Sequence, residues 1–172
     1  YRLRYPNHEV YQSLNIALLA AWTPENQADV QHRKSLYRLL LANDFAGLER
    51  LFTAFFAGIP ADWYRNNPIA RYEGYYASVF YAYFASLGLD MTPEDASCQG
   101  RLDLVVRFND QIYLFEFKVV ELEPEGQALR QIKERGYADK YRAEGQPIHL
   151  IGVEFSREQR RVVRFEVETV SP

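Results

Sequence analysis

The apolar residues of this chain change their spacing once, and that change constrains the fold more than any other feature of the sequence. Before Gly88 they recur about every three to four residues, which is the period of an amphipathic helix. After Pro93 they alternate with polar residues, which is the period of a strand. The order therefore predicts a helical segment joined to an α/β sandwich.

Residues 1–60 are predicted to form a helical subdomain, and residues 61–172 a mixed core. Thr23-Pro24 and Asp44 are typical of helix starts, because Thr and Asp accept backbone N–H bonds there and proline tolerates the first turn. The helix after Asp44 carries Phe and Leu at helical spacing and ends at Gly58. Such an apolar stripe needs a partner, so we expect this helix to pack on the core.

The predicted core has the order helix, strand, strand, helix, strand, strand, over residues 70–87, 101–108, 112–119, 124–144, 148–155 and 162–167. Short polar turns separate the paired strands, and a helix separates the two pairs. This order predicts a mixed sheet flanked by helices.

Composition excludes several classes of protein. Twenty Lys and Arg against 23 Asp and Glu give a net charge of −3, which argues against a polybasic nucleic-acid binder but not against a local basic groove. The single cysteine, Cys98, excludes an internal disulfide framework and favours a reducing, cytoplasmic location. The longest uncharged run, Tyr75–Leu89, is fifteen residues, shorter than the roughly 20 of a membrane helix, so no membrane partner is expected.

Three charged residues on the first two predicted strands carry the chemistry. Because strand side chains alternate between faces, Glu116 and Lys118 share one face, and the turn between the strands brings Asp103 alongside them. Leu102 and Phe117 are expected on the opposite face. Two carboxylates and an ammonium group thus converge, which is costly unless something uses them.

A divalent cation would resolve this conflict, because hard oxygen ligands suit Mg²⁺ or Mn²⁺. Lys118 would then orient the water that attacks a phosphodiester, or neutralise charge in the transition state. The alternative is a salt bridge between Lys118 and one of the carboxylates at a sheet edge. The residue pattern alone leaves both interpretations open.

These residues resemble the core of the PD-(D/E)XK nuclease superfamily, which has an acidic helix, an Asp on one strand, Glu-x-Lys on the next, and then a helix. Leu102 stands where that family has proline before the Asp. The resemblance extends over nearly the whole chain to the nuclease-like C-terminal domain of bacterial AAA-ATPase-like proteins. It is carried by the segments Pro6–Val10, Tyr72–Tyr76, Gly100–Asp103, Ala128–Ile132 and Gly136–Ala138, and by Tyr141.

The resemblance implies a restriction-endonuclease-like fold and metal-dependent hydrolysis of nucleic acid, above all DNA, with Mg²⁺ or Mn²⁺. It also implies an AAA-ATPase-like region upstream in the same polypeptide. By position, Asp103 and Glu116 would be metal ligands and Lys118 the catalytic lysine. Glu73 matches an acidic residue that helps bind metal or water, and Gln131 matches a polar position that faces the site.

Some of these residues also fit other interpretations. Glu73 would also fit the solvated side of an aromatic helix, and Gln131 a solvated helix surface. The last turn carries four arginines that are candidates for contacts with nucleic-acid phosphates: Arg157, Arg160, Arg161 and Arg164. The rival function is a catalytically inert module that docks on or regulates an AAA-ATPase-like protein, and the net acidic charge favours it.

Overall fold

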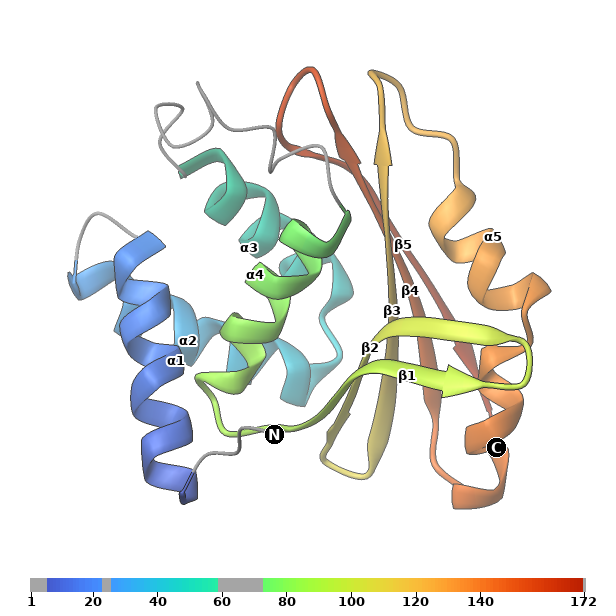
Figure 1. Ribbon diagram of the computed structural model, residues 1–172, viewed down its shortest axis with the longest axis horizontal. Coiled ribbons are helices and arrows are strands. Elements are labelled where there is room, and N and C mark those ends of the chain that lie inside the picture. The colour runs from blue at the N-terminus through green and yellow to red at the C-terminus, as the bar shows by residue number, and fades with distance from the viewer. Residues whose placement is uncertain (1–5, 23–25, 59–72, 172) are drawn as a thin grey trace.

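The computed structural model describes residues 6–22, 26–58 and 73–171, and its centre is a five-stranded mixed sheet (Figure 1). The strands lie side by side in chain order: β1 (Asp90–Ser97), β2 (Gly100–Phe108), β3 (Gln111–Val120), β4 (Ile148–Ser156) and β5 (Val162–Val170). β3 and β4 are parallel, whereas the other neighbouring pairs are antiparallel. A parallel step needs a crossover connection, which the helical segment between β3 and β4 provides.

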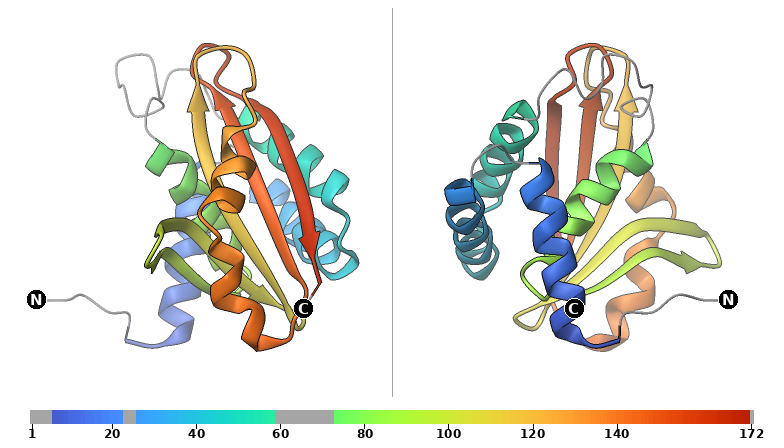
Figure 2. Two further views of the ribbon diagram at one scale, coloured as in Figure 1. Left: turned by 90° about the vertical axis from the view of Figure 1, so that its right-hand side faces the viewer. Right: turned by 60° about the vertical axis from the view of Figure 1, so that its left-hand side comes forward.

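Helices cover both faces of this sheet (Figures 1 and 2). One face carries α1 (His8–Trp22), α2 (Asn26–Ala42), α3 (Phe45–Gly58) and α4 (Glu73–Ala85). The other face carries α5 (Gln127–Glu134) and the 3₁₀ helix η3 (Tyr137–Glu144). The predicted fold, a mixed sheet flanked by helices and preceded by a helical segment, is confirmed. Of the described helices, none combines the length and the hydropathy that a bilayer crossing requires.

Aromatic rings build the core between α3, α4 and the sheet. Phe52 of α3 stacks on Phe80 of α4 with ring centroids 4.0 Å apart, and Phe80 approaches Phe117 of β3 at 4.7 Å. Such pairs add to the stabilisation that burial of their large apolar surface supplies. The expected packing of the Phe-rich helix on the core is therefore observed. Its expected cap is also present, because Asp44 Oδ1 accepts the Gly47 N–H at 2.8 Å.

A polar network joins the turn between α2 and α3 to the sheet. The Tyr113 hydroxyl donates to Asn43 Oδ1 at 2.9 Å, and Asn43 Nδ2 donates to Gln111 Oε1 at 2.8 Å. The same Gln111 oxygen lies 2.6 Å from His149 Nε2. Burial lowers the pKa of His149, so its ring is neutral at neutral pH. These hydrogen bonds attach the turn between α2 and α3 to β3 of the sheet.

Two elements differ from the sequence-based expectation. The sequence does not predict β1, because Pro93 and its acidic neighbours are uncommon in strands. Proline is tolerated at this position because β1 lies at the edge of the sheet. The single helix predicted over residues 124–144 is wrong. It is divided into α5 and η3 at Gly136, whose φ of 57° is left-handed and interrupts a helix. Thr23-Pro24, the proposed boundary at residues 60–61, and residues 70–72 lie outside the described residues.

The expected face of Leu102 is also wrong. Leu104 and Val106 of β2 pack on the α3–α4 side of the sheet, as alternation requires. Leu102 packs instead with Ile132 and Tyr141 on the α5–η3 side. Alternation is lost between residues 102 and 104 because the β1–β2 hairpin bends at this point.

Candidate active site

Asp103 lies where β2 separates from β3. The pairing of these strands ends at Leu104 and Phe115. Beyond that point the Phe117 N–H donates to Asp103 Oδ2 at 2.8 Å rather than to a β2 carbonyl oxygen. The Asp103 carboxylate therefore lies against the strand that carries the Glu-x-Lys sequence.

Glu116 of β3 is buried, with 1% of its surface exposed. Its Oε1 accepts a hydrogen bond from Gln131 Nε2 of α5. Its Oε2 is buried and has no hydrogen-bond partner among the described residues. A buried carboxylate oxygen without a donor is costly, so this atom points to a further cation or donor at the site.

Lys118 lies between two carboxylates. Its Nζ is 3.3 Å from Glu73 Oε2, at the start of α4, and 3.4 Å from Glu116 Oε1. The Lys118 side chain is 18% exposed and that of Glu73 is 42% exposed, so the group opens to solvent on the Glu73 side. The structure thus joins Glu73, Lys118, Glu116 and Gln131 in one series of contacts, with Asp103 next to them on β2.

Burial dominates the electrostatics of this group. Burial, reinforced by the Asp103 charge, raises the pKa of Glu116 to about 7. Burial also raises the pKa of Asp103, although the Phe117 N–H and Lys118 oppose the rise. Burial alone would lower the pKa of Lys118, but the charges of Glu73 and Glu116 outweigh it and the pKa is raised. Lys118 is therefore a cation at neutral pH, beside a carboxyl group close to its titration point.

A second buried glutamate holds α5 against the sheet. Glu154 of β4 is 1% exposed, and its two oxygens accept the backbone N–H groups of four successive residues, 125–128. The first N–H groups of a helix have no acceptor within it, so this carboxylate caps α5 from the neighbouring strand. Gln131 is one turn further along α5. Sequence reasoning missed Glu154; the available signal was a lone acid inside the apolar run 148–155.

Gly152 allows α5 to approach β4 closely enough for Gln131 to contact Glu116. It pairs with Glu116 in the parallel register of β3 and β4. A Cβ atom at Gly152 would lie 2.3 Å from the backbone nitrogen of Leu129 and 2.8 Å from its Cα. Because these neighbours are backbone atoms, any larger residue would displace the helix.

The four arginines of the last turn do not form an unpaired basic patch. Arg157 pairs with Glu121, and Arg164 Nη2 lies 2.6 Å from Glu166 Oε1. The intervening Arg160 and Arg161 are exposed. Carboxylates therefore offset part of the positive charge at this turn.

The donor set at Asp103 and Glu116 fits a hard divalent cation. Among the described residues, no three His, Cys, Asp or Glu side chains form a group that could hold a metal ion. An ion would therefore rest on these two carboxylates, as Mg²⁺ often does when water and phosphate oxygens complete its shell. The orphaned Oε2 of Glu116, and the repulsion that helps raise its pKa, fit such an ion.

A groove of about 250 Å³ lies beside Asp103, between α4 and the β1–β2 hairpin. Ala77 and Tyr81 of α4 line one wall, and Pro93 and Asp103 the other. Of the candidate site residues, Asp103 is thus the one that lines this groove.

The chain matches a family model and a longer relative. The model described as "PD-(D/E)XK nuclease superfamily" matches residues 71–165, which is more than half of the chain and includes Asp103, Glu116 and Lys118. Over 170 residues the chain is 67% identical to a protein of Azotobacter chroococcum mcd 1 described as "Uncharacterized protein in vnfD 5'region". The match covers 99% of this chain and 33% of that relative, so the chain spans about a third of the relative's length. No solved structure matches the chain.

Proposed function

The chain belongs to the PD-(D/E)XK nuclease superfamily, and we propose that it hydrolyses phosphodiester bonds of nucleic acid, DNA first of all, in a reaction that depends on Mg²⁺ or Mn²⁺. One observation carries this proposal. The Glu116 carboxylate is buried beside Asp103 and Lys118, and one of its oxygens has no donor among the described residues. A structural salt bridge between Lys118 and Glu116 would not need Asp103 beside it, because the Asp103 charge adds to the burial that raises the pKa of Glu116 to about 7.

Asp103 and Glu116 would hold the divalent cation, which supplies Lewis-acid stabilisation of the charge that develops on the phosphate. Gln131 donates to Glu116 Oε1 and so leaves Oε2 for the ion. Glu73 belongs to the acidic set that the resemblance assigns to metal or water binding. Its contact with Lys118 supports a further role in orienting that lysine.

Lys118 would act as a cation rather than as a base. The charges of Glu73 and Glu116 raise its pKa against the effect of burial, so it keeps its proton at neutral pH. An ammonium group in this place would donate a hydrogen bond to the attacking water and offset the negative charge of the phosphate.

A cleavage assay tests the proposal. The purified domain is incubated with plasmid and with single-stranded DNA in Mg²⁺, in Mn²⁺ and in chelator. We expect metal-dependent cleavage that Lys118→Ala abolishes. Lys133→Ala, which removes an exposed lysine paired with Glu168, should cleave like the parent. Cleavage that survives in Lys118→Ala would assign the cuts to a contaminant and overturn the proposal.

A catalytically inert interaction module is the second candidate function. The pairing of Arg157 and Arg164 with carboxylates favours it, because it weakens the basic surface that a nucleic-acid substrate needs. We further propose, from the sequence resemblance, that the domain works with an AAA-ATPase-like region of the same polypeptide. No cleavage by the folded parent in either metal ion would favour the inert module.

We also propose that the chain divides into a helical subdomain, residues 1–60, and a nuclease-like core, residues 61–172. The rings of Phe52 and Phe56 on α3 contact Phe80 of α4, which supports tight packing between the two parts. Deletion of residues 1–60 should therefore expose this aromatic surface and make the core aggregate. A soluble, monomeric core of parental stability would contradict the packing argument.

A further inference from the structure

The β1–β2 hairpin changes direction at Asp103. Its second strand pairs with β3 as far as Leu104 and no further. Glu94, at the position opposite Asp103 in the hairpin, has a φ of 50°, which non-glycine residues adopt uncommonly. Leu102, on the far side of Asp103, already packs on the α5–η3 side. Asp103 therefore lies at the bend, within the β1–β2 ladder but beyond the ladder that joins β2 to β3.

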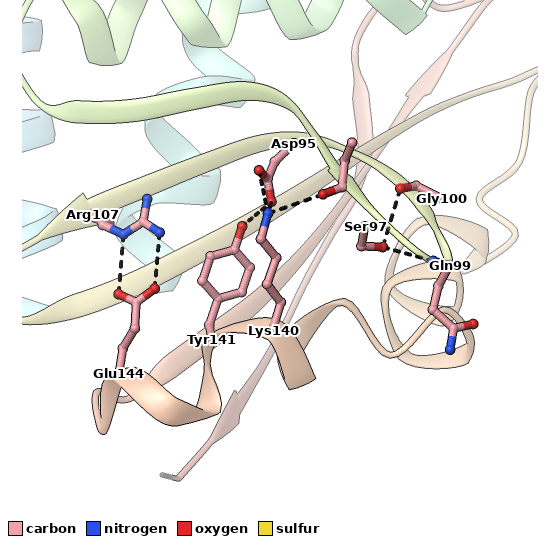
Figure 3. A network of polar contacts seen from close by, with 9 residues as sticks. Asp95, Ser97, Gln99, Gly100, Arg107, Lys140, Tyr141 and Glu144 are labelled. Atoms are coloured by element: carbon pink, nitrogen blue, oxygen red, sulfur yellow. Dashed lines mark hydrogen bonds and ion pairs between the residues drawn. The ribbon is translucent and has the colours of Figure 1, made fainter.

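Side chains of η3 hold the bent end of the hairpin (Figure 3). Lys140 Nζ lies 2.7 Å and 2.6 Å from the two carboxylate oxygens of Asp95 and 3.2 Å from the carbonyl oxygen of Ala96. The Tyr141 hydroxyl donates to the same Asp95 carboxylate. We call Asp95, Lys140 and Tyr141 the hairpin lock.

The lock is shielded from water on one side only, because Tyr141 is buried whereas the Lys140 side chain is 43% exposed. The Asp95 side chain is 15% exposed. Burial would raise the pKa of Asp95, but the hydrogen bonds from Lys140 and Tyr141 outweigh it and lower the pKa. Asp95 is therefore ionised at neutral pH, and its bonds are of the stronger, charge-assisted kind.

Two further bonds reach the backbone of the same hairpin end. Arg135 Nη1 donates to the Gln99 carbonyl oxygen at 2.6 Å, and the Tyr137 hydroxyl donates to that of Arg101 at 3.0 Å. Every one of these contacts comes from the segment that also carries Gln131, the partner of Glu116. One helical segment thus touches both strands of the candidate metal site.

We propose that the hairpin lock is a positioning device that fixes the bent half of the hairpin and thereby the place of Asp103 relative to Glu116. The consequence for metal binding rests on the proposed function, whereas the positioning is a property of the metal-free protein. Asp95, Lys140 and Tyr141 are positioning residues, because they act on the site through the hairpin backbone. Groups that orient metal ligands in this way affect metal affinity without touching the ion.

Amide hydrogen exchange of Phe117 tests the positioning without metal. Its N–H donates to Asp103 Oδ2 at 2.8 Å, so it reports directly on the place of that carboxylate. In Lys140→Met and in Tyr141→Phe, this amide should exchange about tenfold faster or more, the factor that loss of one hydrogen bond to a charged group gives. Arg142→Ala breaks an exposed η3 pair with Asp139 and should leave the rate unchanged. An unchanged exchange rate of the Phe117 amide in the lock variants would overturn the proposal. An equal acceleration at the Leu114 amide, in the middle of β3, would also overturn it, because it would indicate global destabilisation.

Mn²⁺ affinity, measured by calorimetry, tests the consequence. Lys140→Met should weaken binding about tenfold, as loss of an outer partner of a metal ligand does. In an Asp103→Asn background the same change should have no further effect, because the lock acts through Asp103. A full additional loss in that background would contradict action through this residue. A parent that binds no Mn²⁺ would overturn the proposed function, and the exchange of Phe117 would still decide the positioning.

Discussion

Replacement of Glu154 by Gln should destabilise the protein although it hardly changes the volume of the side chain. The carboxylate accepts the N–H groups of residues 125 and 126 at Oε2, and those of residues 127 and 128 at Oε1. Gln keeps one oxygen, which can accept two of these bonds. Its –NH₂ group faces the other two N–H groups, which are donors as well. Two N–H groups at the start of α5 therefore lose their acceptor.

The magnitude follows from these two lost bonds. A hydrogen bond to a charged group contributes about 1.5–3 kcal/mol, so together they amount to roughly 3–6 kcal/mol. Part of this loss in the free energy of unfolding is offset, because an amide is less costly to bury than a carboxylate. Water can also reach some of the freed donors, since residues 125 and 127 are exposed. We expect the free energy of unfolding to fall by about 2–3 kcal/mol and the melting temperature by about 5–10 °C.

Urea denaturation at neutral pH in chelator measures this loss. Glu158→Gln makes the same chemical change at an exposed residue and should stay within about 0.5 kcal/mol of the parent. A loss below about 1 kcal/mol in Glu154→Gln, or a loss equal to that of the control, would refute the capping argument. Because α5 also carries Gln131, the variant should lose Mn²⁺ affinity as well.

Further substitutions test the strands beneath the site. Gly152→Ala should lower the free energy of unfolding, measured in urea, by about 1–3 kcal/mol, because the new Cβ would meet the Leu129 backbone and displace α5. A variant of parental stability would show that α5 can shift without an energetic cost. Glu116 has a pKa of about 7 in the folded protein, above the 4.5 of a free glutamate side chain. The stability that its neutral form contributes is thus present below about pH 4.5 and lost as pH rises through about 7. In chelator the parent should therefore lose about 2–3 kcal/mol relative to Glu116→Gln between about pH 5 and about pH 8. Parallel pH profiles would contradict the burial of this carboxylate. Asp103→Asn should be as stable as the parent or more stable in chelator, since it removes a charge that repels Glu116. It should lose most of the thermal stabilisation that Mn²⁺ gives the parent, and a destabilised variant beside a parent that Mn²⁺ leaves unchanged would end the metal-site proposal.

Local patterns predicted most of the elements, and their failures have local causes. The Phe-rich stripe of α3 and the alternation of β3 are periodic, so their buried faces follow from the backbone geometry of helix and strand alone. β1 lacks this apolar periodicity and contains Pro93 and Glu94, which local patterns do not assign to a strand. A strand with these residues is tolerated because β1 lies at the edge of the sheet. Gly136 interrupts the predicted helix by its backbone conformation, which periodicity does not report.

The sequence by itself determined which chemical groups meet at the site. Alternation along β3 places Glu116 and Lys118 on one face, and the tight turn before β3 brings Asp103 of the preceding strand near them, with no knowledge of the rest of the fold. Only the tertiary structure decided what holds them there. Glu154 caps α5 although 26 to 29 positions of sequence separate it from the N–H groups that it accepts. Lys140 contacts Asp95 across a sequence separation of 45 positions. No local period relates such partners, because they meet only after a parallel crossover and a bent hairpin have brought separate elements into contact.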